Sequence, residues 1–277
     1  MELSISPFVS PPMKKLLLFI LLTLSSSFEM LAAEAVTDNS TRTSSSPENR
    51  VVLLELYTSE GCSSCPPADQ FLSSLKSAGI STEQLIPMAF HVTYWDYIGW
   101  KDRFANQQFD KRQRELARKN DLSTIYTPQF VLSGDDYRAY ATFSEDVNRL
   151  AAEKATVAIS LSAHITSDRN DTDTLHLDLS ADISMSEVED VAFYLVVIED
   201  NLTSDVDDGE NKGRKLHHDS VVRQFLGPYY QSKPQKQLRR EQAITLQPEW
   251  KRQDISIIAF AENPQTGEVL QAVSLKY

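Results

Sequence analysis

Residues 61–69 of the chain read GCSSCPPAD and contain its only two cysteines, Cys62 and Cys65. The stretch follows an apolar run at residues 51–57, VVLLELY, which predicts a buried strand. After Cys65, a proline at the first turn and spaced apolar residues predict a helix. A CxxC pair at a strand-to-helix junction lies beside unpaired N–H groups and the positive end of a helix dipole, which stabilise a thiolate. The stretch therefore indicates thiol–disulfide chemistry.

Length and charge narrow the class of protein. The chain has 277 residues, enough for two domains of ordinary size, and 41% of them are hydrophobic. Its formal net charge is -12. Because an acidic surface repels nucleic acid and anionic lipid, we expect neither of them as a partner.

The N-terminus has the pattern of an export signal. A basic start at Met13, Lys14 and Lys15 precedes an apolar run at residues 16–24, and alanines at 32, 33 and 35 offer cleavage sites. We therefore predict a signal peptide at residues 1–35, with Met13 as a possible true start, and a disordered linker at residues 36–50. The apolar run is shorter than the ~20 residues that cross a bilayer, so we expect no membrane span in the mature chain. An uncleaved anchor is the alternative. The protein would be periplasmic or secreted.

The pattern changes near residue 155. Strands predicted at residues 85–92 and 128–132 alternate with helices at 104–119 and 143–154, the latter with Ser144 as N-cap, which predicts an α/β domain over residues 51–155. Alternating apolar and polar residues then predict an antiparallel β-sandwich over residues 156–277. Its expected strands are 157–165, 174–179, 191–198, 221–226, 243–246, 255–261 and 269–275. Residues 233–240 are expected to form a solvated linker between strands.

Several segments resemble one family of secreted bacterial proteins. They are LYTSEGCSSCPPAD at residues 56–69, HVTYWDYIGWKD at 91–102, YTPQ at 126–129, GRKL at 213–216 and VVR at 221–223. The family is known as a domain of unknown function with a thioredoxin-like fold, so the resemblance implies that fold for residues 51–155. The chain departs from thioredoxin itself, because no tryptophan precedes Cys62 and two serines separate the cysteines.

Two further residues, Pro128 and Glu55, are candidates for roles at the cysteine pair. A cis-proline lies against the CxxC disulfide in thioredoxin-like folds, and Thr127-Pro128 stands directly before the expected strand, so we expect Pro128 to be cis. Glu55, inside the apolar strand, is a candidate proton acceptor for the second cysteine if burial raises its pKa. The alternative is a strand-edge glutamate that points to solvent.

The cysteines themselves allow more than one role. Position predicts that Cys62 is the exposed, attacking sulfur and that Cys65 resolves the mixed disulfide. The direction of electron flow stays open, because two serines supply no charge to set the potential. A static disulfide is an alternative to catalysis. Zinc bound by the pair and His91 is another, but we expect His91 to support the neighbouring aromatic loop.

A loop rich in aromatic residues follows the second expected strand. Its members Tyr94, Trp95 and Trp100 are candidates for a recognition surface beside the sulfurs, together with Thr127; packing around a turn is the alternative. Residues 205–210, DVDDGE, lack the ligand spacing of a calcium loop and are expected to be a solvated hairpin loop. We expect no metal and no cofactor.

We therefore predict an exported thiol–disulfide oxidoreductase that acts on a protein thiol or disulfide. A non-enzymatic envelope binding protein with a structural disulfide is the second hypothesis.

Overall fold

The computed structural model describes residue 1, residues 40–170 and residues 172–277. The expected signal peptide and the first part of the expected linker lie outside the described residues. From residue 40 onwards, the described chain belongs to one compact unit that spans Thr37–Tyr277. Within the described residues, no helix is both long enough and apolar enough to cross a membrane.

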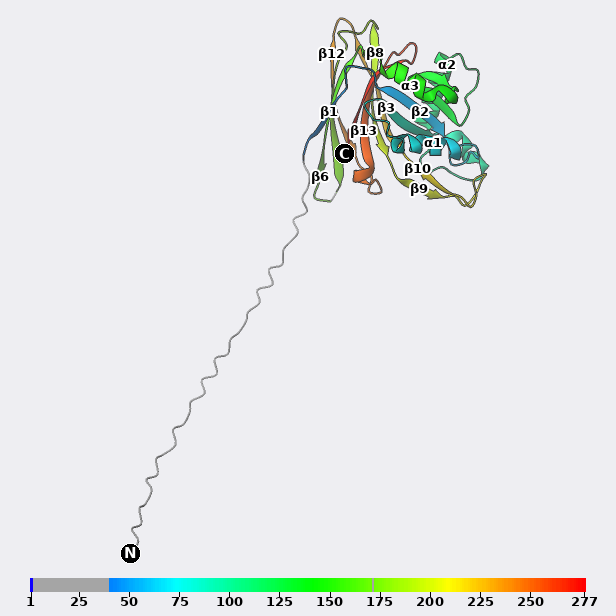
Figure 1. Ribbon diagram of the computed structural model, residues 1–277, viewed down its shortest axis with the longest axis vertical. Coiled ribbons are helices and arrows are strands. Elements are labelled where there is room, and N and C mark those ends of the chain that lie inside the picture. The colour runs from blue at the N-terminus through cyan, green and yellow to red at the C-terminus, as the bar shows by residue number, and fades with distance from the viewer. Residues whose placement is uncertain (2–39, 171) are drawn as a thin grey trace. The chain divides into compact units, whose positions relative to one another are not determined.

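Strands and helices alternate in the first half of the unit (Figure 1). In chain order these elements are β1 (Arg42–Ser45), β2 (Val52–Thr58), α1 (Pro66–Ser77), β3 (Leu85–His91), the 3-10 helix η1 (Thr93–Ile98), α2 (Gln107–Lys119), β4 (Gln129–Leu132), β5 (Asp135–Tyr137), η2 (Tyr140–Thr142) and α3 (Phe143–Ala151).

The second half is almost entirely strands. They are β6 (Ala158–Ser167), β7 (Asp173–Asp182), β8 (Asp190–Glu199), β9 (Leu202–Asp205), β10 (Lys215–His218), β11 (Val221–Ser232), β12 (Gln237–Thr245), β13 (Ile255–Glu262) and β14 (Val269–Lys276), with η3 (Arg252–Asp254) before β13.

Strands from both halves pair in one sheet. Its order is β14-β13-β8-β11-β3-β2-β4-β5, and the halves join where β11 runs parallel to β3. There the N–H of Ala89 donates to the carbonyl of Ser220 at 2.8 Å. Strands from both sides of the boundary expected near residue 155 therefore pair in the same sheet. The protein is mostly β, with several sheets, because strands of the second half continue the sheet of the first.

Two smaller sheets complete the strands. One has the order β1-β6-β7-β12 and the other is the two-stranded pair β10-β9. In Figure 1, β1, β6 and β12 lie at one end of the unit and the three α-helices lie at the other, with β8 and β13 between them.

The long sheet is buried on both faces, as the alternation of side chains along its strands requires. Val52, Leu54 and Leu56 of β2 pack with α1 and α3. Leu53 and Tyr57 face the opposite way and pack in a core that includes residues of α2, β8 and β13. Alternate residues of β8 and β13 form a further core with β6, β7 and β12.

Some expected boundaries were wrong. Residues 42–45 of the expected linker form β1, which pairs with β6 and is followed by a bridge between Asn49 and Lys154. Residues 237–240, expected to be a solvated linker, belong to β12, which pairs with β7 along its whole length. Both segments are polar, so their apolar content does not reveal strands that expose one face.

Two helices begin at other residues than expected. Thr142, not Ser144, is the N-cap of α3, because the tight turn of η2 leads directly into it. Helix α2 begins at Gln107, since the side chain of Asn106 accepts a hydrogen bond from the N–H of Gln108 at 2.9 Å and caps the helix there. Phe104 consequently lies outside the helix.

Candidate functional site

A disulfide joins Cys62 and Cys65 between β2 and the first turn of α1. Cys65 is the N-cap of α1 and already has helical backbone angles, and Pro66 begins the helix, as the sequence predicts. The expected exposure of Cys62 is wrong: Cys62 is 1% exposed and Cys65 is 0% exposed. The serines between them are exposed. The sulfurs are therefore enclosed, although the loop that carries them reaches the surface.

The tip of the hairpin formed by β9 and β10, residues 206–214, lies on the backbone of the disulfide loop. The side-chain amide of Asn211 donates to the carbonyls of Glu60 and Cys62 at 2.8 and 3.0 Å. The N–H of Ser63 donates to the carboxylate of Glu210 at 3.1 Å. The acidic segment that was expected to be only a solvated loop thus ends at the cysteine pair.

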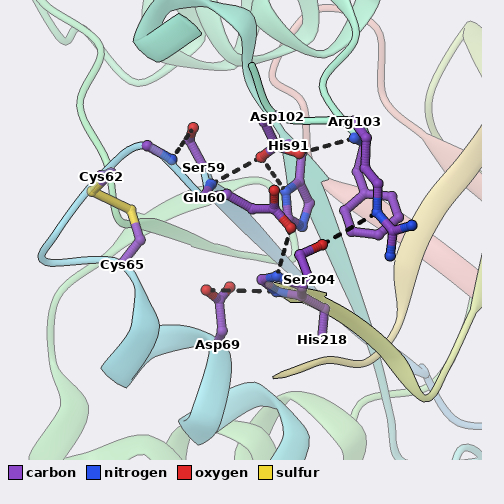
Figure 2. A network of polar contacts seen from close by, with 12 residues as sticks. Ser59, Glu60, Cys62, Cys65, Asp69, His91, Asp102, Arg103, Ser204 and His218 are labelled. Atoms are coloured by element: carbon purple, nitrogen blue, oxygen red, sulfur yellow. Dashed lines mark hydrogen bonds and ion pairs between the residues drawn. A yellow bond between two sulfur atoms is a disulfide. The ribbon is translucent and has the colours of Figure 1, made fainter. Parts of the chain in front are cut away.

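A buried polar network lies behind the disulfide (Figure 2). Its centre is Asp102, whose carboxylate accepts from the N–H of Glu60 at 2.9 Å and from Nδ1 of His91 at 2.6 Å. Burial opposes the charge on both side chains of this pair, but their mutual attraction outweighs it. It lowers the pKa of Asp102 and raises the pKa of His91. His91 therefore supports the aromatic loop through Asp102.

His218 brings the second half of the chain into this network. Its Nε2 lies 3.2 Å from Oε1 of Glu60, and its ring meets that of His91 edge to face at 4.9 Å. Burial alone would raise the pKa of Glu60, but the hydrogen bond with His218 helps to lower it. Trp100 donates to the other oxygen of Glu60 at 2.8 Å. The indole of Trp100 is thus an internal anchor and not a free recognition surface.

Asp69 joins the network from α1. Its carboxylate is 6% exposed and lies 3.9 Å from Nδ1 of His218. Burial raises the pKa of Asp69, although the positive potential of His218 opposes the shift. The N–H of Asp69 donates to the carbonyl of Cys65, so the two residues stand one helical turn apart on the same face of α1. The structure thus places a carboxyl group of raised pKa one helical turn from Cys65.

The expected proline bond is confirmed, since the Thr127-Pro128 peptide is cis. The indole N–H of Trp95 donates to the hydroxyl of Thr127 at 2.7 Å. A Cβ added at Gly61 would lie 3.2 Å from Cβ of Trp95, so Trp95 packs directly on the residue before Cys62. Trp95 therefore connects two of the expected segments, the CxxC turn and the Thr127-Pro128 turn.

Tyr94 lies deeper in the aromatic loop. Its hydroxyl donates to Gln113 of α2 at 3.1 Å, and burial raises its pKa to about 12. Its position supports packing of the loop on α2 and not display to solvent.

Glu55 lies elsewhere than expected. It shares its face of β2 with Leu53 and Tyr57, whereas α1 covers the opposite face. Its two carboxylate oxygens accept hydrogen bonds from Arg112 at 2.8 and 2.6 Å. Glu55 is therefore the partner of a buried arginine on the face opposite α1. The alternative of a solvent-facing glutamate is also wrong, because Glu55 is buried.

Sequence reasoning did not assign a role to several members of the network: Glu60, Asp69, Asp102, Asn211 and His218. Two of them carried a usable signal. Asp69 stands four residues after Cys65, the spacing of one helical turn. In the pair His217-His218, strand alternation must bury one ring and expose the other, and β10 buries His218. Across the described residues, no group of His, Cys, Asp and Glu is arranged to hold a metal ion.

The fold and the site together define a protein of several β-sheets with a CxxC disulfide at the start of a helix. The chain belongs to the protein family of unknown function DUF1223, whose model matches residues 53–262. No functionally curated protein shows significant similarity to it.

Solved structures with a similar fold include the following two. A protein of Agrobacterium tumefaciens is 21% identical and superposes with a TM-score of 0.52 over 83% of this chain and 96% of its own. HBP35 of Porphyromonas gingivalis is 14% identical, with a TM-score of 0.59 over 83% of this chain and 76% of its own.

Proposed function

We propose that this protein is an exported, thioredoxin-like thiol–disulfide oxidoreductase that exchanges its Cys62–Cys65 disulfide with the thiols of a client protein. The order β2, α1, β3, α2, β4 supports the thioredoxin-like assignment, with the CxxC pair at the start of α1. The observation that carries the proposal is the position of the pair at the start of α1, with the buried titratable groups Asp69, His91 and His218 behind it.

The small stabilisation that this disulfide can supply favours a role in thiol–disulfide exchange over a purely structural role. A disulfide stabilises a fold mainly by closing a loop in the unfolded chain, and a loop of about four residues is worth only ~2 kcal/mol. Buried charged groups add little net stability, because losing their hydration offsets their attraction. Groups with shifted pKa values concentrate instead at functional sites. A purely structural disulfide requires none of these titratable groups.

The exchange has two steps. A client thiolate attacks Sγ of Cys62, the Cys62–Cys65 bond breaks, and its electron pair leaves on Sγ of Cys65, which takes up a proton. Asp69 is placed to pass that proton, because its carboxyl stands one turn along the same helix. A second client thiolate then attacks the client sulfur of the mixed disulfide and releases Cys62 as a thiolate, which takes up the second proton from water. The client has gained a disulfide, and the pair has gained two electrons and two protons. The same steps in reverse reduce a client disulfide.

A trapping experiment tests the proposal. Cys65→Ser keeps the attacking sulfur but cannot resolve a mixed disulfide, so it should accumulate a client adduct through Cys62 in cells that export the protein. Cys62→Ser is the matched control and should trap nothing. Equal absence of adducts in both variants, with insulin reduction by the native protein at background, would refute the proposal.

A binding protein with a structural disulfide is the second candidate, and the burial of both sulfurs favours it. A redox titration separates the two candidates. A structural bond resists reduction above about −300 mV, whereas an exchanging pair has a higher potential.

A further inference from the structure

The hairpin tip, residues 206–214, provides direct contacts to the disulfide loop from the second half of the chain. Asn211 is fully buried, and its amide holds the carbonyls of Glu60 and Cys62. Glu210 accepts the N–H of Ser63, within the CxxC sequence. The tip thus spans the loop from the residue before Gly61 to the first serine between the cysteines. Both cysteines are 0–1% exposed while these contacts to the backbone of their loop are in place.

The tip belongs to a short hairpin at the edge of the site. Among the described residues, strands β9 and β10 pair only with each other, over four residues each. Most residues of the tip are exposed; Val206 and Asn211 are buried. Gly209 and Gly213 have positive φ angles of 73° and 80°, a backbone freedom suited to a hinge. Local opening is therefore least costly here.

The base of the hairpin is anchored. Leu216 and His218 of β10 are buried, and Arg103 donates to the carbonyl of Thr203 at 2.6 Å. The aromatic loop on the other side of Gly61 is also fixed, because Trp95 packs against a core cluster and is bonded to Thr127. An opening of the tip would therefore leave the buried network behind the disulfide in place.

We propose that the hairpin tip is a lid over the Cys62–Cys65 disulfide and that Asn211 is its latch, a positioning residue that must release the Cys62 carbonyl before a client sulfur can approach. Within the described residues, Oδ1 of Asn211 is buried without a hydrogen-bond partner. Opening lets water reach this oxygen, which offsets part of the cost of breaking the two amide bonds. The lid itself does not depend on the proposed function. Only the identification of the incoming molecule as a client polypeptide rests on it.

Reduction of the disulfide by a water-soluble phosphine measures access without any client. If the tip must open, the rate follows the population of the open state. Asn211→Ala removes both latch bonds, and we expect reduction about tenfold faster than in the native protein, the effect of one to two hydrogen bonds. Lys212→Ala, at an exposed neighbour in the same tip, should leave the rate unchanged. The melting temperatures of both variants establish that they are folded.

Amide hydrogen exchange of the native protein provides an independent measurement. The N–H of Gly213, which donates to Val206, and the N–H of Ser63 should exchange much faster than the core strands β2 and β3. A folded Asn211→Ala variant reduced at the native rate would overturn the lid, as would tip amides that exchange only with global unfolding. Faster reduction in a protein that exchanges with no client would support the lid and refute the proposed function.

Discussion

Nε2 of His218 lies 3.2 Å from Oε1 of Glu60, and 158 residues separate the two in the chain. Glu60 stands just before the cysteine pair, and His218 ends the strand that follows the hairpin tip. Both side chains are buried, at 0% and 1% exposure. The contact therefore makes the second half of the chain part of the network behind the disulfide.

Replacing His218 should destabilise the whole unit. His218→Ala leaves the Glu60 carboxylate buried without its partner, which should cost about 3 kcal/mol and lower the melting temperature by roughly 6–12 °C. His217→Ala is the matched control, because His217 is exposed and pairs only with Asp219 at the surface. Its melting temperature should stay near the native value. Equal effects in the two variants would show that Glu60 does not depend on His218.

The His91–Asp102 pair should make stability depend on pH. The folded pKa of His91 is raised above the ordinary value of 6.5, so its contribution is complete below that pH and is lost as the pH rises through the folded pKa. The lowered pKa of Asp102 gives the opposite sign: its contribution is complete above 3.8 and is lost in acid. Urea denaturation should show falling stability on the alkaline side of about pH 6.5. In His91→Asn, which cannot titrate, this decline should be smaller; an unchanged decline would assign it to other groups.

The sequence predicts those elements of the fold that depend on residues close to one another in the chain. The strand before Cys62, the helix after Cys65 and the turn before Pro128 are set by apolar spacing and proline, which act within a few residues. The pairing of β11 with β3 was not predictable in this way. It joins Val221 to Ala89, which are far apart in the chain, and a buried apolar side chain carries no mark of its neighbour.

The residues of the candidate site also fall into those that local motifs indicate and those that they do not. Cys62, Cys65 and Thr127 could be chosen from local motifs. Asn211 lies in an acidic, glycine-containing tip with no periodicity, so nothing local indicates that its side chain is buried. The sequence identified the strand that carries Glu55 but not the face of the sheet on which its side chain lies. A carboxylate within an apolar strand must find a partner, and the sequence does not tell which face of β2 holds Arg112.

Asp69, and not Glu55, should control proton uptake by the cysteine pair. Because burial raises the pKa of Asp69, its ionised form is costly in the fold, and Asp69→Asn should increase stability above the folded pKa of that carboxyl. In the reduced protein, Asp69→Asn should also shift the pH at which the thiolate absorbance appears. Glu55→Gln should lower stability and leave the thiolate titration unchanged. A shift in Glu55→Gln alone would reverse the assignment.

Arg112 connects the two halves of the chain on the face of the long sheet opposite α1. It binds Glu55 of β2 and, at 3.0 Å, Glu262 of β13, and its guanidinium lies 5.1–5.2 Å from the ring centres of three aromatic residues. These aromatic residues are Tyr194, Phe225 and Phe260. Burial of this charge is tolerable only because both carboxylates face it.

Removing the guanidinium should therefore be among the most costly single changes in the protein. Arg112→Ala leaves two buried carboxylates, of which only Glu262 keeps a cation, Lys119 at 2.9 Å. The free energy of unfolding, measured in urea, should fall by about 3–5 kcal/mol. Arg114→Ala, on the exposed face of the same helix, is the control and should change little. The double variant Arg112→Met with Glu55→Leu should recover part of the loss, because it removes the Glu55 charge and fills the space with apolar atoms. If the double variant were no more stable than Arg112→Ala, the cost would lie in packing against the aromatic rings and not in the unpaired carboxylate of Glu55.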